Sequence, residues 1–460
     1  MGLTLEFAEF IAGLRSDDID DNALAIAQLG CVDTIATAFA GVHDDASQKV
    51  MTFARRRIIQ ESDICKLPWL LDTMPVPMAA LVFGTTAHAL DFDDVALSGH
   101  PSTVLVPAIL CEGLARGLPG RTCLEAYVVG YQVWAELFQR EPDSLHIKGW
   151  HPTAVYGVLA ATAAIAYARD MATNSIATSL AIAASLASGL VANFGTMTKP
   201  LHAGRAASLA FEAIEYGNLG ITAAEDALEH HAGFLNAVSP SGNVNRSTAM
   251  HQEDGWLISQ HGLCIKQYPV CYSGHRAIDA TIDLASTHNV ALEDVLRVSV
   301  GLGRPQLSML RNHQPKTSLE AKFSIQFAVA CALDQRNVGL SQLVNEYVNR
   351  PHLQDFYTKV DTWCVETPDP DDPTFSKYDS VELTLRDGRV LKSGDIPYAR
   401  GHAANPISTE ALRYKFQDCL TRFTEHSDGS ASAILPEVNT LFSRLTKIAT
   451  SENIAQIFTK

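Results

Sequence analysis

Residues 87–102 concentrate side chains that can transfer protons, namely His88, Asp91, Asp93, Asp94 and His100. Carboxylates and imidazoles are the usual general acids and bases of enzymes. A simpler interpretation is the end of a helix followed by an acidic loop, with Ser102 capping the next helix. A metal site at Asp91, Asp93 and His100 is a further alternative, although their spacing matches no specific metal-ligand motif.

A second candidate, His151, stands in the sequence GWHPT (149–153), directly before a long apolar helix. A histidine at a helix start lies near the positive end of the helix dipole, which favours the neutral imidazole. A neutral imidazole can act as a general base near pH 7. The same position also suits a helix cap followed by Pro152 as the first helical residue, and the two interpretations are compatible.

A third cluster contains Lys199, His202 and Arg205, which are spaced by three residues. If the segment is helical beyond Pro200, the spacing places them on one face, where they would suit the binding of carboxylates. The alternative is a loop followed by a solvated basic helix face. Gly195 and Gly204 indicate a close approach of backbones instead.

A fourth cluster is KQYPVCYSGH (266–275), in which Tyr268 or Tyr272 could donate a hydrogen bond to a substrate oxygen. Both tyrosines could equally pack at a domain junction, which we favour for Tyr272. The chain contains no GxSxG nucleophile motif, no phosphate-binding P-loop and no Rossmann glycine fingerprint. Neither a phosphate ligand nor a dinucleotide cofactor is therefore supported.

The composition is that of an ordinary globular protein, with 47% apolar and 19% charged residues and a formal net charge of −16. This charge, without a basic cluster beyond residues 55–57, argues against nucleic-acid binding. The nine cysteines form no CxxC pair, so we expect a reducing compartment and no disulfide framework. The start of the chain does not resemble a secretory signal, and we expect the longest apolar runs, such as 154–168, to be too short to span a membrane. We predict a cytoplasmic protein.

The elements that must position these clusters differ between the two parts of the chain. Up to about residue 255, Ala- and Leu-rich segments predict consecutive helices at 22–42, 78–90, 102–116, 123–138, 153–169 and 175–191. Later segments predict strands at 295–302, 380–385 and 389–393, helices at 274–287, 319–333 and 409–423, and an acidic loop at 368–373. Asp387-Gly388 predicts a hairpin turn. We predict a helical domain from residues 1–264 and 401–460, and an α+β domain from 265–400, with a small-molecule site in the cleft between them.

Six motifs in this order resemble the MmgE/PrpD family: AHALDFDD (87–94), HPST (100–103), GWHPTA (149–154), GTMTKPLHAGRAA (195–207), KQYPVCYSGH (266–275) and LEAKFSIQFA (319–328). The resemblance implies a mainly α fold with a large helical domain and a smaller α+β lid, a homodimer, and no metal or organic cofactor. By position in the motifs, it implies catalytic roles for Asp93, His100, His151, Lys199 and Tyr268. His202, Arg205, Lys266 and His275 are candidates for substrate binding. Pro200 after the motif lysine is similar to the family's epimerase and departs from its decarboxylase pattern.

The implied reaction is proton transfer at a carbon next to a carboxylate of a small di- or tricarboxylate. An enolate-like charge would develop there, and Lys199 with a nearby imidazole could stabilise it. We expect a cofactor-independent lyase similar to 2-methylcitrate dehydratase. The alternatives are a cis-aconitate decarboxylase, an isomerase that epimerises an amino- or hydroxy-dicarboxylate in the manner of iminodisuccinate epimerase, and a carboxylate-binding protein without catalytic activity.

Overall fold

The computed structural model describes residues 2–56, 64–70, 72–250, 255–370, 374–426 and 435–460. Arg57 of the basic triplet and residues 371–373 of the acidic loop lie outside these ranges. The chain folds into two compact units, one formed by residues 1–263 and 408–460 and the other by residues 264–407. The fold is mainly α, as the sequence predicts.

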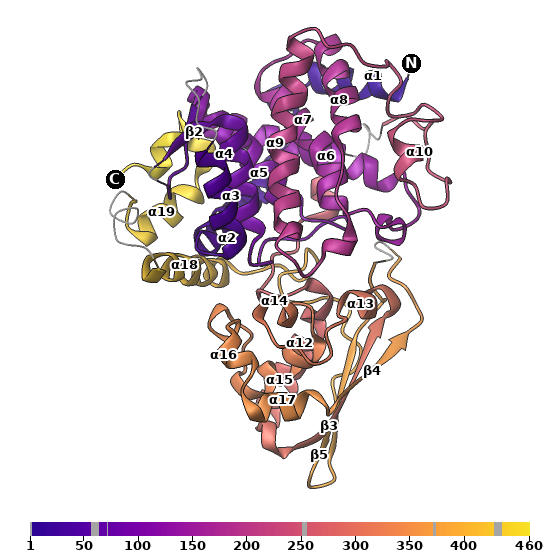
Figure 1. Ribbon diagram of the computed structural model, residues 1–460, viewed down its shortest axis with the longest axis vertical. Coiled ribbons are helices and arrows are strands. Elements are labelled where there is room, and N and C mark those ends of the chain that lie inside the picture. The colour runs from indigo at the N-terminus through magenta and orange to yellow at the C-terminus, as the bar shows by residue number, and fades with distance from the viewer. Residues whose placement is uncertain (1, 57–63, 71, 251–254, 371–373, 427–434) are drawn as a thin grey trace. The chain divides into compact units, whose positions relative to one another are not determined.

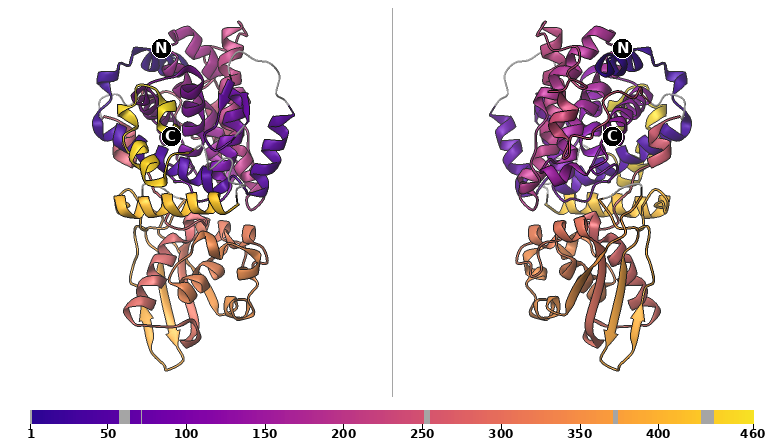
Figure 2. Two further views of the ribbon diagram at one scale, coloured as in Figure 1. Left: turned by 90° about the vertical axis from the view of Figure 1, so that its left-hand side faces the viewer. Right: turned by 90° about the vertical axis from the view of Figure 1, so that its right-hand side faces the viewer.

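The first unit is a bundle of helices (Figure 1). Its helices are α1 (Leu3–Gly13), α2 (Asp21–Gly41), α3 (Asp45–Arg55), α4 (Val76–His88), α5 (Ser102–Arg116), α6 (Gly120–Gln139), α7 (Pro152–Ala168), α8 (Thr173–Leu186), α9 (Thr198–Asn218), α10 (Phe234–Val238), α11 (Leu257–His261), α18 (Thr409–His426) and α19 (Val438–Leu445). A short antiparallel pair, β1 (Ile64–Lys66) and β2 (Thr73–Pro75), completes it. Figure 2 shows both chain ends in this unit, where α18 packs against α2.

Contrary to the expectation that the apolar runs are too short, the helix α2 is long and apolar enough to cross a membrane by length and composition only. However, 78% of its most apolar window is buried inside the unit, and the buried Asp33 lies in the helix. Both features are those of a core helix that packs on its neighbours.

Glycines allow α4 and α9 to approach closely. A Cβ atom at Gly84 would lie 2.7 Å from the Cα of Gly204, and a Cβ at Gly204 would overlap the carbonyl oxygen of Leu81. Both partners are backbone atoms, which cannot move aside as a flexible side chain can. The close crossing fixes the end of α4 beside the beginning of α9, and both ends carry candidate site residues.

The substitution Gly204→Ala is therefore expected to destabilise the first unit by about 1–3 kcal/mol, the usual cost of overpacking. A matched control is Gly13→Ala in α1, where a Cβ meets no atom within 4 Å. That change should alter stability by no more than about 1 kcal/mol. Urea unfolding of both variants measures the difference. Equal stabilities of the two variants would contradict the close crossing.

The second unit contains a four-stranded sheet in the order β4-β3-β5-β6. Its elements are α12 (His275–Thr287), β3 (Val295–Gly303), α13 (Arg304–Met309), α14 (Ser318–Ala321), α15 (Ile325–Gln335), α16 (Asn345–Val348), α17 (Pro351–Tyr357), β4 (Val360–Val365), β5 (Ser380–Leu385) and β6 (Val390–Lys392). Strand β3 pairs parallel with β4 and antiparallel with β5, and β5 and β6 form a hairpin. Buried side chains alternate along β5, and α12 packs against both β5 and α15 to close an apolar core.

Two predicted helices differ from the observed elements. The helix predicted at 319–333 is divided into α14 and α15, because the Ser324 hydroxyl accepts a hydrogen bond from the Phe327 amide and caps a new helix. The helix predicted at 175–191 ends at Leu186, ahead of Gly189 with φ +133°. Glycine adopts this conformation readily, whereas a helix cannot continue through it.

Candidate active site

Four helix ends of the first unit bring the candidate residues together. Helix α4 ends at His88, and the following loop returns at Ser102 as α5. His151 immediately precedes α7, and Lys199 is the second residue of α9. Because α4, α5, α7 and α9 pack closely in the bundle, these ends form one polar cluster.

The centre of the cluster is an ion pair between Lys199 and Asp91. The Lys199 ammonium donates to Asp91 Oδ1 over 2.7 Å, and both side chains are buried. The ammonium also lies 5.4 Å from the centre of the Phe194 ring. Asp91 has a left-handed backbone, with φ +53°, and its amide donates to the carbonyl of His88. A non-glycine residue in this region is strained, and such strain is concentrated at functional sites.

Asp93 is held between two imidazoles. The Nδ1 atom of His88 lies 2.9 Å from Asp93 Oδ1, and the Nδ1 atom of His100 lies 2.7 Å from Asp93 Oδ2. Burial opposes ionisation of Asp93, but the two imidazoles outweigh it and keep the pKa of this carboxyl well below its usual range. An ionised carboxylate only accepts, so both Nδ1 atoms must carry protons. Asp93 therefore sets the tautomers of both His88 and His100.

His100 has the geometry of a proton-transfer group. When His100 is neutral and donates its Nδ1 proton in a hydrogen bond to Asp93, its Nε2 atom carries a lone pair. This Nε2 atom lies 3.9 Å from Asp91 Oδ1. Its side chain is 12% exposed, whereas those of His88 and Asp93 are completely buried. The backbone amide of His100 donates to the Thr153 hydroxyl of α7, which fixes the residue from a second helix. An imidazole oriented by a carboxylate is the usual arrangement for general acid–base catalysis.

His88 lies behind this arrangement. Burial lowers the pKa of His88 to about 3 in spite of Asp93, so this imidazole is neutral. Its ring centre lies 4.4 Å from that of His100. His88 thus supports Asp93 and His100 from inside the bundle.

His151 and His202 form a second imidazole pair, with their Nδ1 atoms 3.2 Å apart. Burial, and then the charge of Lys199, lower the pKa of His151 well below its usual range and also lower that of His202. One Nδ1 must donate and the other accept. His151 is the residue before the first helical residue, Pro152, as expected, and burial is the largest cause of its lowered pKa.

The substitution His151→Gln is expected to lower turnover by about 10², the lower end of the range for a general acid–base group, because His202 remains beside the vacated position. Glutamine keeps a hydrogen-bonding amide and a similar volume. Steady-state rates with a saturating substrate measure the effect, and circular dichroism checks the fold. A folded His151→Gln variant with the rate of the original chain would exclude a catalytic role for this residue.

Arg205 does not share the face of Lys199, which corrects the expectation of a three-residue cationic face. Six residues of helix correspond to a rotation of about 240°, so Arg205 points away from the cluster. Its side chain is 46% exposed and pairs with Glu212 at 3.1 Å. His202 remains in the cluster as the partner of His151.

The other predicted site residues belong to the second unit. The Tyr268 hydroxyl donates to Asp279 Oδ1 over 2.6 Å, and burial and this carboxylate raise the Tyr268 pKa. Lys266 is fully buried, and His275 donates from Nε2 to the carbonyl of Val270. The rings of Tyr268 and His275 lie 5.1 Å apart at the beginning of α12, and Lys266 is buried in the same unit.

His88 and Asp91 belong to the segment rich in proton-transfer groups, but the family motifs imply no catalytic role for either of them. The sequence signal that could have linked these two residues is their spacing of three at a helix end. This spacing allows the Asp91 amide to donate a hydrogen bond to the His88 carbonyl. A fifth histidine, His146, also lies near the cluster, with its ring 5.9 Å from that of Phe194. Burial, with Lys199 and His100, lowers its pKa to about 4.

Among the described residues, His88, Asp91, Asp93 and His100 offer potential metal-ligand atoms that all lie within 4.8 Å of one another. The donor types would suit a divalent cation. However, the Lys199 ammonium already donates a hydrogen bond to Asp91, and Asp93 accepts hydrogen bonds from both imidazoles. A metal ion could bind there only by replacing these hydrogen bonds, and the positive charge of the ammonium would oppose its binding.

Treatment with EDTA is therefore expected to leave activity unchanged. Turnover is measured before and after chelation and gel filtration, with the metal content determined in parallel. Activity that disappears on chelation and returns with a divalent ion would contradict this expectation, and would identify the four residues as metal ligands.

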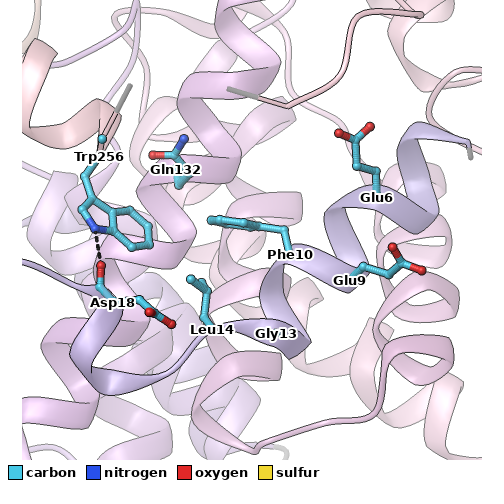
Figure 3. A pocket seen from close by; sticks show the side chains of 9 residues that line it. Glu6, Glu9, Phe10, Gly13, Leu14, Asp18, Gln132 and Trp256 are labelled. Carbon is cyan, nitrogen blue, oxygen red and sulfur yellow. Dashed lines mark hydrogen bonds between the residues drawn. The ribbon is translucent and has the colours of Figure 1, made fainter. Parts of the chain in front are cut away.

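A separate cavity of about 560 Å³ lies in the first unit (Figure 3). Phe10 and Trp256 line it together with the acidic residues Glu6, Glu9 and Asp18. The Trp256 indole donates to the carbonyl of Asp18 over 3.0 Å. None of the residues of the histidine cluster lines this cavity, so it plays no part in the site described above.

A helical unit with a buried lysine–aspartate pair and histidines held by a carboxylate contains the side chains that acid–base catalysis requires. Family models agree: the MmgE/PrpD N-terminal domain matches residues 5–247, and the MmgE/PrpD C-terminal domain matches residues 268–439. The chain belongs to the MmgE/PrpD family and is an enzyme of the lyase type.

Similar proteins include three cis-aconitate decarboxylases. The protein from Homo sapiens is 28% identical over 430 residues, which cover 90% of this chain and 87% of the relative. The protein from Mus musculus is 28% identical, with 90% and 86% covered. The protein from Aspergillus terreus is 23% identical, with 93% and 91% covered. The similarity therefore extends over nearly the whole of both chains.

Proposed function

We propose that this lyase decarboxylates a small unsaturated tricarboxylate of the cis-aconitate type. The supporting observation is the Lys199–Asp91 pair beside His100, whose tautomer is set by Asp93. The names of the relatives favour loss of CO₂ over the dehydration that the motifs first suggested. Lysine and histidine supply the required positive charge and proton, so the proposal needs no cofactor.

In the proposed reaction, the bond between the substrate's methylene carbon and its carboxylate breaks, and CO₂ leaves. The electron pair forms an allylic anion that extends to the carbon beside another carboxylate. A preorganised ammonium near that carboxylate stabilises the developing charge. We assign this role to Lys199, which Asp91 holds in position.

The anion then takes one proton at the former alkene carbon that carries the terminal carboxylate. The product is a five-carbon dicarboxylate with a terminal methylene group. We assign proton delivery to His100. Its Nε2 takes a proton from solvent before the reaction, and Asp93 stabilises the resulting imidazolium through Nδ1. The net reaction consumes one proton and releases one CO₂, so the atoms and charges balance.

The test is incubation of the purified chain with cis-aconitate in D₂O, followed by proton NMR and measurement of CO₂. The expected result is CO₂ release with one deuterium in the methylene group formed by protonation. Parallel reactions contain 2-methylcitrate and iminodisuccinate. Water loss from 2-methylcitrate alone would make the chain a dehydratase, and solvent exchange of iminodisuccinate without net conversion would make it an epimerase. Binding without turnover of any substrate would contradict the proposal and leave a carboxylate-binding protein.

A further inference from the structure

A second buried ion pair lies directly behind the loop that carries Asp91 and Asp93. The ammonium of Lys415, in α18, lies 2.6 Å from Oδ1 of Asp33, in α2. The side chain of Lys415 is 5% exposed, and that of Asp33 is completely buried. Removing two charges from water is costly, and such a pair is weak evidence for stability alone. Its position suggests a different use.

The same ammonium donates to the carbonyl oxygen of Phe92 over 2.7 Å, and lies 4.0 Å from the centre of the Phe92 ring. Phe92 is the residue between Asp91, which binds Lys199, and Asp93, which orients His100. One ammonium therefore fixes the short backbone segment on which both site carboxylates depend. The positive φ of Asp91 requires such support from outside the loop.

Asp94 extends this support to His100. The Ser102 hydroxyl donates to Asp94 Oδ2 and lies 2.6 Å from the Tyr127 hydroxyl. Burial, and then the charge of Asp33, raise the pKa of Asp94, whereas the Lys415 ammonium lies against Asp33. The backbone carbonyl of Asp94 lies 2.9 Å from His100 Nδ1. The loop is thus held at Phe92 by a charge and at Asp94 by hydroxyl groups.

We propose that Lys415 is a positioning residue for catalysis, which acts through the Phe92 carbonyl to hold Asp91 and Asp93 in the geometry required by Lys199 and His100. Its kinetic consequence rests on the proposed function, whereas its structural consequence does not. Misplacement of a reacting group by about 1 Å can cost a factor of about 10² in rate. Because Lys415 lies behind the loop, its loss should lower kcat and leave KM little changed.

The first variant is Lys415→Met, which removes the ammonium and keeps most of the side-chain volume. It is expected to lower kcat by about 10–10² and to lower the melting temperature, since Asp33 is left without its counter-ion. The matched control is Lys49→Met, which breaks the exposed pair of Lys49 and Asp45 in the same unit. This control should retain the kcat and melting temperature of the original chain, because exposed pairs contribute little.

The double variant Asp33→Asn/Lys415→Met separates positioning from stability. It removes both buried charges, so the melting temperature should recover in large part. The Phe92 carbonyl still lacks its donor, so kcat should stay low. Recovery of kcat together with the melting temperature would overturn the proposal, as would a normal kcat in folded Lys415→Met.

A readout without substrate completes the test. In protein labelled at histidine, the imidazole NMR signals of His88 and His100, assigned by single substitutions, should shift in Lys415→Met and in the double variant but not in Lys49→Met. If the original chain turns over none of the substrates, the proposed function fails and this measurement alone decides the role of Lys415. Unchanged imidazole signals would then overturn it.

Discussion

Replacing Lys199 by methionine is expected to lower kcat/KM by about 10²–10³, the usual cost of removing one preorganised donor from a developing anion. Lys199 is only 6% exposed and its ammonium is bonded to Asp91. Methionine keeps the buried volume that alanine would leave empty, so the change mainly removes the charge. The effect should appear in kcat, because the charge it stabilises develops during the reaction.

Two further variants separate this catalytic effect from a loss of stability. Lys199→Met/Asp91→Asn removes both members of the buried pair, which should restore stability without restoring the rate. Arg205→Met, in the same helix, removes an exposed cation and should leave kcat/KM unchanged. Steady-state kinetics and thermal unfolding are measured for all three. A stable Lys199→Met variant with a normal rate would exclude Lys199 from the reaction.

Six helices of the first unit, α2 and α4 to α8, were predictable because burial in a bundle leaves a strong local pattern, whereas α3 was not predicted. The segment 102–116 is predicted and observed with the same bounds, and α7 begins at Pro152, within one residue of its prediction. Apolar periodicity and a proline at the first turn are local signals. The break between α14 and α15 was missed because Ser324 interrupts an apolar pattern through a hydrogen bond that periodicity does not record.

The sequence singled out Asp93, His100, His151, Lys199 and His202, which the first unit brings together, but not the contacts that each of them makes. The sequence places three aspartates within four residues, and all are chemically alike. Their roles differ because Asp91 turns through a positive φ toward Lys199, which is 108 residues away along the chain, whereas Asp93 accepts from His88 and His100. Such long-range pairing leaves no local trace.

The contact between Lys415 and the Phe92 carbonyl was even harder to predict from the sequence. Lys415 lies 323 residues from Phe92, in a helix that resembles an ordinary amphipathic surface helix. A lysine there is normally solvated, and only the packing of α18 on α2 shows that this one is buried beside Asp33. Local patterns therefore predict elements, whereas the ionisation states and orientations at the site follow from contacts between distant elements.

The substitution His100→Gln is expected to lower turnover by about 10²–10⁴, the contribution of a well-placed proton-transfer group. Glutamine can still hydrogen-bond to Asp93, but it cannot take up and release a proton. In D₂O, the variant should lose the deuterated product and the release of CO₂ together, since the anion reverts when it is not protonated. KM should change little, because the binding charge at Lys199 remains.

Asp93→Asn tests the orientation of His100 rather than its presence. An asparagine amide cannot stabilise the imidazolium as the carboxylate does, so the rate should fall although His100 is intact. His43→Gln is the matched control, because burial also lowers the pKa of this histidine, which packs against the Phe423 ring in the same unit. It should retain the full rate. If His100→Gln retains product formation while His151→Gln loses it, proton delivery belongs to the His151–His202 pair, and Asp93 with His100 serves only to hold the loop around Asp91.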